Sequence, residues 1–187
     1  MVQKKAKEIK LHLGCGKRNI PGFINIDRSK YKHIDYNISV IDLSIFKNNS
    51  VDMIYASHVL EYFDLKQTYQ VLKEWRRVLK KNGLLRLSIP NLESLIKVYK
   101  KTNKIDKIIG PLFGRMKSGN QIIYHKYVHD YNSMSSILKR AKFNKIKLFD
   151  WKKTFHSKFD DHSQAYFPHM HKKTGIMISL NIDAKKK

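Results

Sequence analysis

The chain has 187 residues, of which 42% are hydrophobic, and this length and composition favour one folded domain with a sizeable core. It contains no run of about 18 or more apolar residues, so the sequence predicts no membrane-spanning segment. The first residues lack the apolar stretch of a secretory signal, and Cys15, the sole cysteine, cannot form an internal disulfide. We therefore expect a cytoplasmic protein.

The net charge of +23 comes from 38 Lys and Arg against 15 Asp and Glu. An excess of this size is typical of proteins that bind nucleic acid. The lysines are scattered, however, and several lie at the chain ends (Lys4, Lys5, Lys7 and 185–187), a pattern that is typical of a solvated surface. The scattered lysines therefore do not favour nucleic acid as a partner, although the net charge permits it. The charge would also attract nucleotide-linked sugars, phosphorylated glycans or membrane headgroups.

The first predicted strand runs into a Gly-x-Gly turn. Residues 9–13 alternate between apolar and polar, which is the period of a strand. Gly14 and Gly16 follow, and residues without side chains let a ligand approach the backbone. A second short strand, 23–26, ends in Asp27. An acid in this place typically accepts hydrogen bonds from ribose hydroxyls, so the two strand ends predict a nucleoside site.

The rest of the chain continues with alternating strands and helices. The segment 65–80 has apolar residues three and four apart, and Asn82-Gly83 should end it, with Gly83 in the left-handed conformation. In chain order we expect a strand at 51–56, a helix at 65–80, a strand at 84–89, a helix at 92–102, an irregular stretch at 103–130, a helix at 132–142, a strand at 145–151, an irregular stretch at 154–173 and a strand at 176–182.

This alternation predicts an α/β fold with a mostly parallel central sheet and helices on both faces. Ligands of such sheets bind outside the carboxyl ends of the strands. The Gly-x-Gly turn, Asp27, Ser57-His58 and Pro90-Asn91 all follow predicted strands. We therefore expect them to gather on one rim of the sheet.

The chain resembles class I S-adenosylmethionine-dependent methyltransferases. Five segments carry the resemblance in the family's order: Leu13-Gly-Cys-Gly16, Ile26-Asp27, Ile41-Asp42-Leu43, Val51-Asp-Met-Ile-Tyr-Ala-Ser-His-Val-Leu-Glu61, and Arg76-Arg-Val-Leu-Lys-Lys-Asn-Gly83. The resemblance implies a Rossmann-like fold and S-adenosylmethionine as cofactor. It also implies the cofactor contacts: the loop Gly14, Cys15 and Gly16, the ribose ligand Asp27, the adenine contacts Asp42 and Leu43, and the closing edge Ser57 and His58.

The C-terminal half resembles a narrower group of small methyltransferases that are often found among glycan-synthesis genes. The similarity rests on His125 with Leu138-Lys-Arg-Ala-Lys-Phe143, on Asp160-Asp-His-Ser-Gln-Ala-Tyr166, on Pro168-His-Met170 and on Ser179-Leu-Asn-Ile-Asp-Ala184. It implies a single methyltransferase domain over residues 1–187, with a cofactor-binding half at 8–92 and acceptor-binding segments at 103–173.

The chain also departs from related patterns. Asp27 follows Gly16 by only 11 residues, whereas a dinucleotide-binding fold needs about 20. The fold is thus shortened between its first two strands, and no helix is available there to bind a pyrophosphate. This favours a sulfonium cofactor over a nicotinamide dinucleotide. Tyr62 stands where many relatives have His, and Asn82-Gly83 replaces a Pro-Gly turn.

Three side chains are candidates for the chemistry of methyl transfer. His58 follows a predicted strand on the rim and is a candidate base, although a structural histidine there would give the same pattern. Glu61, three residues further on, can orient His58 or bind the acceptor, or can merely cap the turn. His125 is a second candidate base, with a packing role as its alternative.

The histidine-rich stretch 154–173 is our candidate for acceptor recognition. Its His and Asp residues are of types that bind zinc, but their spacing matches no compact motif, so we predict no metal. Phe167 and Pro168 would supply apolar walls for a small ring. The expected acceptor contacts are Asp161, His162, Tyr166 and His169 in this stretch, with Arg115 and Tyr124 forming an opposite wall.

The sequence therefore predicts an enzyme that methylates a hydroxyl of a sugar or another small polar acceptor. The resemblance suggests this acceptor, and glycan biosynthesis is the expected setting. One alternative is an RNA or protein methyltransferase that its basic surface draws to the substrate. Another is a non-catalytic binding subunit that keeps the fold.

Overall fold

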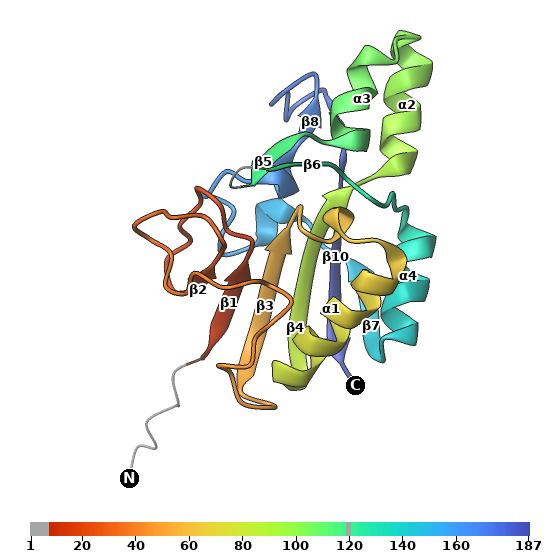
Figure 1. The fold of residues 1–187 in the computed structure, drawn as a ribbon. Helices are drawn as coiled ribbons and strands as arrows, with labels where there is room; N and C mark the ends of the chain where they lie inside the picture. Colours follow the sequence, from red (N-terminus) through yellow and green to blue (C-terminus); the bar gives the residue numbers. More distant parts are fainter. Residues whose placement is uncertain (1–7, 119–120) are drawn as a thin grey trace.

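A computed structural model describes residues 8–118 and 121–187, and its centre is one main sheet (Figure 1). The lysines Lys4, Lys5 and Lys7 and the pair Gly119-Asn120 lie outside the described residues. β2, β1, β3 and β4 run parallel, whereas β10 runs antiparallel to both β4 and β7. The α/β class and the mostly parallel sheet are thus confirmed. Across the sheet the order is β2 (Ile24–Ile26), β1 (Lys10–Leu13), β3 (Val51–Ser57), β4 (Leu79–Pro90), β10 (Ser179–Lys186) and β7 (Phe143–Leu148).

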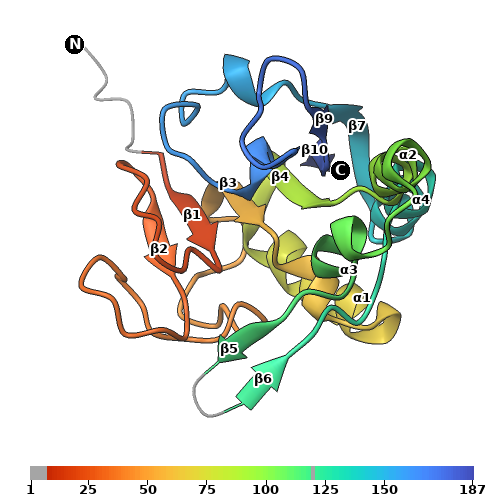
Figure 2. The same ribbon diagram turned by 90° about the horizontal axis from the view of Figure 1, so that it is seen from above.

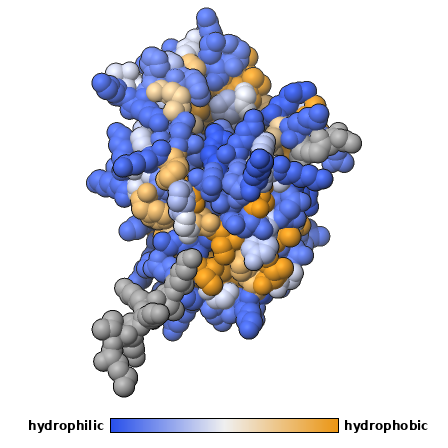
Figure 3. Space-filling model, turned by 90° about the vertical axis from the view of Figure 1, so that its left-hand side faces the viewer, coloured by the Kyte–Doolittle hydropathy of each residue, from blue (hydrophilic) through white to orange (hydrophobic). Residues whose placement is uncertain are grey.

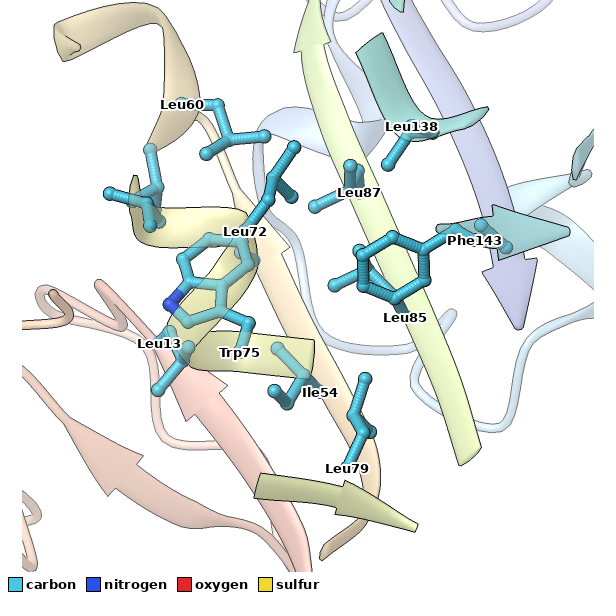
Figure 4. Close-up of a cluster of buried hydrophobic side chains, with 14 of the residues drawn as sticks. Leu13, Ile54, Leu60, Leu72, Trp75, Leu79, Leu85, Leu87, Leu138 and Phe143 are labelled. Atoms are coloured by element: carbon cyan, nitrogen blue, oxygen red, sulfur yellow. The ribbon is translucent and has the colours of Figure 1, made fainter. Parts of the chain in front are cut away.

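Helices α1 (Leu65–Val78) and α4 (Tyr131–Arg140) pack on one face of the sheet. Trp75 of α1 is fully buried there, and its indole Nε1 donates a hydrogen bond to the carbonyl of Val40 at 2.8 Å. This side of the sheet is therefore the main hydrophobic core. Figure 4 shows part of it, with Leu13, Ile54, Leu60, Leu72, Trp75, Leu79, Leu85, Leu87, Leu138 and Phe143 labelled.

The opposite face of the sheet is more polar, although it carries the small apolar cluster of Ile20, Phe23, Met53 and Tyr55, and it is also covered. One row of paired residues crosses it from β2 to β10: Asn25, His12, Tyr55, Arg86 and Asp183. Figure 2 shows the segment that follows β7 passing over this face, on the side away from α1.

Our expectation of helices on both faces therefore needs correction. Among the described residues, the segment over the polar face forms only two short helical turns, η2 (Trp151–Lys153) and η3 (His162–Gln164). Polar side chains that alternate along the strands do not offer the apolar surface that an amphipathic helix needs. An irregular segment instead supplies hydrogen-bonding groups.

The remaining elements lie beyond the carboxyl ends of the parallel strands (Figure 1). They are α2 (Leu92–Thr102), α3 (Asp106–Phe113), the hairpin β5 (Met116–Ser118) and β6 (Gln121–Ile123), and the short pair β8 (Tyr166–Phe167) and β9 (Ile176–Met177). Our prediction that 103–130 is irregular was wrong at α3 and at the hairpin. Gly110 and Pro111 obscure the helical pattern of α3, because both are poor helix formers.

The strand predicted at 84–89 begins earlier, at Leu79, the strand predicted at 176–182 is divided into β9 and β10, and β8 lies in the stretch predicted to be irregular at 154–173. The end of α1 also differs from the prediction. The helix ends at Val78, and Asn82 takes the left-handed conformation (φ +61°) that we expected of Gly83. Gly83 is needed for space, because a Cβ there would lie 2.9 Å from the carbonyl oxygen of Lys80. Within the described part of the chain, no helix combines the length and the apolar character that crossing a bilayer requires.

We predict that Trp75→Ala lowers the free energy of unfolding by about 3–5 kcal/mol, because it opens a cavity and leaves the Val40 carbonyl without its donor. Urea unfolding followed by circular dichroism measures this loss. Leu65→Ala, at the exposed start of the same helix, should change the value by less than about 1 kcal/mol. Equal effects of the two substitutions would contradict this description of the core.

Candidate functional site

The carboxyl ends of the parallel strands meet at one rim of the sheet, as predicted. Gly14 follows β1, Asp27 follows β2, His58 follows β3 and Asn91 follows β4. Because β10 is antiparallel, its first residue, Ser179, lies opposite Pro90 and joins the same rim.

The glycine loop and Asp27 hold each other in place. The Asp27 carboxylate accepts hydrogen bonds from the backbone N–H of Gly16 and from that of Ser29, both at 2.8 Å. The imidazole Nε2 of His33 lies 3.0 Å from the carbonyl oxygen of Gly16. Each carboxylate oxygen can accept a further bond, and Asp27 is only half-buried. The carboxylate can therefore still accept two ribose hydroxyls.

The two glycines of the loop serve different purposes. A Cβ on Gly14 would lie 2.5 Å from Cγ2 of Val59, so this glycine is required by packing within the chain. A Cβ on Gly16 would meet no atom within 4 Å, and its φ of +53° disfavours other residues. Gly16 therefore leaves open space beside its Cα, although Asp27 and His33 engage its N–H and its carbonyl. Cys15 between the two glycines is buried, and burial raises the pKa of its thiol to about 12, which fits no nucleophilic role.

The loop that carries Asp42 and Leu43 is fixed to α1. Glu74 accepts a hydrogen bond from the backbone N–H of Leu43 at 2.9 Å, and Arg77 donates one to the Leu43 carbonyl at 3.0 Å. Both backbone groups of Leu43, which we expected to contact adenine, are therefore already hydrogen-bonded within the chain. The Asp42 side chain is exposed, and its carboxylate accepts a bond from the N–H of Ser44.

His58 is held by contacts on both ring nitrogens. Its Nδ1 lies 3.1 Å from Oε1 of Glu61, and its Nε2 lies 3.0 Å from Oγ of Ser179. The residue adopts the left-handed conformation, with φ at +56°, while its N–H continues the ladder to Ser88. A strained backbone around an oriented imidazole is a frequent feature of functional sites. The neighbouring Ser57 hydroxyl is buried and has no hydrogen-bond partner among the described residues.

Glu61 joins His58 to His125. The Glu61 side chain is almost fully buried, and its Oε1 lies 4.0 Å from Nε2 of His125. The Nδ1 of His125 lies 3.1 Å from the carbonyl oxygen of Pro111, and its ring packs where a Cβ of Gly114 would be. Burial lowers the pKa of His125, and the Glu61 charge partly opposes this shift. The structure thus brings His58, Glu61 and His125 together.

The structure places the expected acceptor residues in different surroundings. Asp161 is buried, and its two carboxylate oxygens accept hydrogen bonds from the Tyr55 hydroxyl and the Ser163 N–H, so its role as an acceptor contact stays a prediction. The His162 ring lies 4.9 Å from the His58 ring, next to the candidate base. The other members are Tyr166, which is half-buried, and Arg115, Tyr124 and His169, which are exposed.

Tyr166 lines a hollow of about 380 Å³ beside the rim. Its hydroxyl accepts a hydrogen bond from the indole N–H of Trp151 at 3.3 Å. Asn91 and Ser179 line the same hollow, so it adjoins the residue that contacts His58.

Sequence reasoning missed Ser179, His33 and His129. Ser179 opens the last strand and His33 lies in a loop, so neither stands in a pattern that points to the rim. His129 is buried, and neither ring nitrogen has a hydrogen-bond partner within residues 8–118 and 121–187. In the same described part of the chain, no group of three or more His, Cys, Asp or Glu side chains is arranged to hold a metal ion.

Residues 15–87, less than half of the chain, match a family described as a methyltransferase domain. These residues carry a methyltransferase domain. The match spans Cys15, Gly16, Asp27 and the segment from His58 to Glu61, whereas Gly14, Asn91 and Ser179 of the rim lie outside it. The search of curated proteins found no match to the sequence.

Solved structures with the same fold extend over nearly the whole methyltransferase chain. A SAM-dependent methyltransferase from Methanosarcina mazei is 15% identical, with a TM-score of 0.59 and coverage of 97% of this chain and 94% of its own. A possible histamine N-methyltransferase from Thermotoga maritima is 17% identical, with a TM-score of 0.59 and coverage of 98% and 84%. The 1,6-didemethyltoxoflavin-N1-methyltransferase of Burkholderia thailandensis, solved with S-adenosylhomocysteine, is 10% identical, with a TM-score of 0.57 and coverage of 96% and 71%.

The buried histidines predict that the methyltransferase loses stability in mild acid. Burial lowers the pKa of His129 to about 4, from 6.5. Below pH 6.5 the unfolded state therefore binds more protons than the folded state, and the free energy of unfolding falls as pH falls toward 4. His129→Leu should reduce this slope by up to about 1.4 kcal/mol per pH unit in urea unfolding. His129→Asn should reduce the slope as much as His129→Leu does, because neither replacement binds a proton in this pH range. If both variants kept the wild-type slope, His129 would not be buried in its neutral form.

Asp27→Asn should weaken binding of S-adenosylmethionine at least about tenfold, because it removes the charge that strengthens hydrogen bonds from ribose hydroxyls. Isothermal titration calorimetry with S-adenosylmethionine and S-adenosylhomocysteine measures the change. Asp106→Asn on α3 is the matched control and should bind as the wild type does. Unaltered affinity in Asp27→Asn would show that the ribose is held elsewhere.

Proposed function

We propose that this methyltransferase methylates a hydroxyl of a sugar or another small polar acceptor in glycan biosynthesis. Residues 8–92 would hold the cofactor, and residues 103–173 would form the acceptor side of a single domain. The observation that carries the proposal is the position of His58, between the buried carboxylate of Glu61 and a serine that lines a hollow. The sole cysteine is a buried free thiol, which supports a reducing, cytoplasmic setting.

The rim fits S-adenosylmethionine through Gly16 and Asp27. Gly16 leaves open space beside its Cα, and the half-buried Asp27 keeps free acceptor positions for ribose hydroxyls. Asp42 adds an exposed carboxylate, and Ser57 and His58 form the edge toward the acceptor. When bound, the cofactor supplies a methyl group already activated on a sulfonium sulfur.

His58 has the surroundings of a general base. A hydroxyl acceptor must lose its proton as the new bond forms, and a positioned imidazole can take it. Contact with Glu61 fixes the ring and would stabilise the imidazolium that results. The acceptor hydroxyl would approach Nε2 of His58 from the side on which the Ser179 hydroxyl now lies. His125 contacts the same carboxylate from the acceptor side and would act as a positioning residue.

The hollow beside Ser179 supports a small acceptor. Aromatic side chains (Trp151 and Tyr166) and polar ones (Asn91 and Asn181) line it together, a combination typical of sites for small polar molecules. His162 lies next to His58 and would complete this wall.

The net charge of +23 supports a second candidate, methylation of RNA or of a protein. Transfer of labelled methyl from S-adenosylmethionine distinguishes the candidates. We expect label in small molecules from a panel of nucleotide sugars and sugar phosphates, and none in total RNA or in bulk protein. Label in RNA or protein would overturn the proposed acceptor, and binding of cofactor without any transfer would favour a non-catalytic subunit.

His58→Gln should lower kcat on the labelled acceptor by about 10²–10⁴-fold, because it removes the proposed base. The affinity for S-adenosylmethionine should change little, and part of the rate should return at higher pH, where hydroxide replaces the base. The matched control is His171→Gln, which replaces an exposed histidine and should leave kcat unchanged. A similar kcat in both variants would remove His58 from the mechanism.

A further inference from the structure

Helix α3 is apolar on two sides, and only one of them is covered. Ile108 is buried against Leu95 of α2. Ile105, Ile109 and Phe113, spaced four residues apart, form a stripe along another side, which we call the α3 stripe. Their exposed fractions are 57%, 45% and 53%. Three large apolar side chains in one exposed stripe are unusual on a protein that needs only solvent around it.

The hairpin that follows α3 continues this surface. Met116, Ile122 and Tyr124 are also exposed, and both ribbon views place β5 and β6 next to α3 (Figures 1 and 2). Figure 3 shows apolar side chains among hydrophilic ones in the upper part of the molecule, at the level of α2 and α3.

The sequence around the α3 stripe is strongly basic. Residues 94–117 contain seven basic residues and one acidic residue, Asp106, which pairs with Lys107 at 2.8 Å. This composition opposes a second copy of the chain as the occupant, because its lysines would face those of the first. A phosphate backbone would pair with the lysines but would leave the isoleucines uncovered. An anionic lipid surface complements both features, since headgroups attract lysines while apolar side chains enter the acyl boundary.

We propose that the α3 stripe and its flanking lysines dock this protein on an anionic lipid surface. The C-terminal end of α3 contacts the candidate site, because the carbonyl of Phe113 accepts the N–H of His125 at 2.7 Å. Docking would therefore bring the acceptor side of the rim close to the headgroups. The proposal does not rest on the proposed function, because lipid binding can be measured without methyl transfer.

Co-sedimentation of the full chain with phosphatidylglycerol vesicles and with phosphatidylcholine vesicles tests this. We expect binding to phosphatidylglycerol and at least about tenfold weaker binding to phosphatidylcholine. Ile109→Glu should weaken binding to phosphatidylglycerol at least about tenfold, because it places a carboxylate in the apolar layer. Leu148→Glu is the matched control, because Leu148 is 60% exposed on β7, outside the stripe. It should bind as the wild type does.

If Ile109→Glu lowers the midpoint of thermal unfolding, Phe113→Gln serves as a second variant. It should also weaken binding to phosphatidylglycerol vesicles. Equal binding by the stripe variants and by Leu148→Glu would overturn the proposal, since lysines alone would then hold the protein. Light scattering without vesicles gives another decisive outcome. A wild-type dimer that Ile109→Glu converts to a monomer would show that a second copy covers the stripe.

Discussion

The difference between the two faces of the central sheet is the constraint on which the rest of the structure depends. Residues that alternate along each strand place Leu13, Ala56 and Leu87 on one side, where α1 and α4 cover them. Burial of this apolar surface is the main stabilising term, and it fixes the register of the strands. Because the four strands from β2 to β4 run parallel in that register, their carboxyl ends meet at one rim.

The polar face needs a different cover, and this decides the form of the C-terminal half. Tyr55 and Arg86 are removed from water, so their polar groups require partners within the protein. Asp161 accepts the Tyr55 hydroxyl, and Asp183 pairs with Arg86 through two contacts at 2.8 and 2.9 Å. The segment that follows β7 is therefore held by the contact of Asp161 with Tyr55 and by Phe159, which packs against the apolar cluster around Tyr55. The same segment brings His162 beside His58.

At the rim, the buried carboxylate of Glu61 connects the end of β3 with the turn after α3. An isolated charge in this position would be costly, so the histidines around Glu61 matter for folding as well as for chemistry. His58 follows β3, whereas His125 packs against Gly114 at the end of α3. The proposed base and the proposed lipid-docking helix are thus linked through Glu61. A change in the position of α3 would reach the candidate site through His125.

The sequence by itself determined the features that depend on local pattern. Strand periodicity, the helix at 92–102, the glycine turn before Asp27 and the cofactor class all follow from neighbouring residues. Tertiary structure alone decided the contacts between distant segments, such as Tyr55 with Asp161 across 106 residues and Ser179 with His58. It also separated Gly14, which packs under Val59, from the open Gly16. Local sequence cannot specify these contacts, because they depend on which strands pair, in what register, and which segment covers each face.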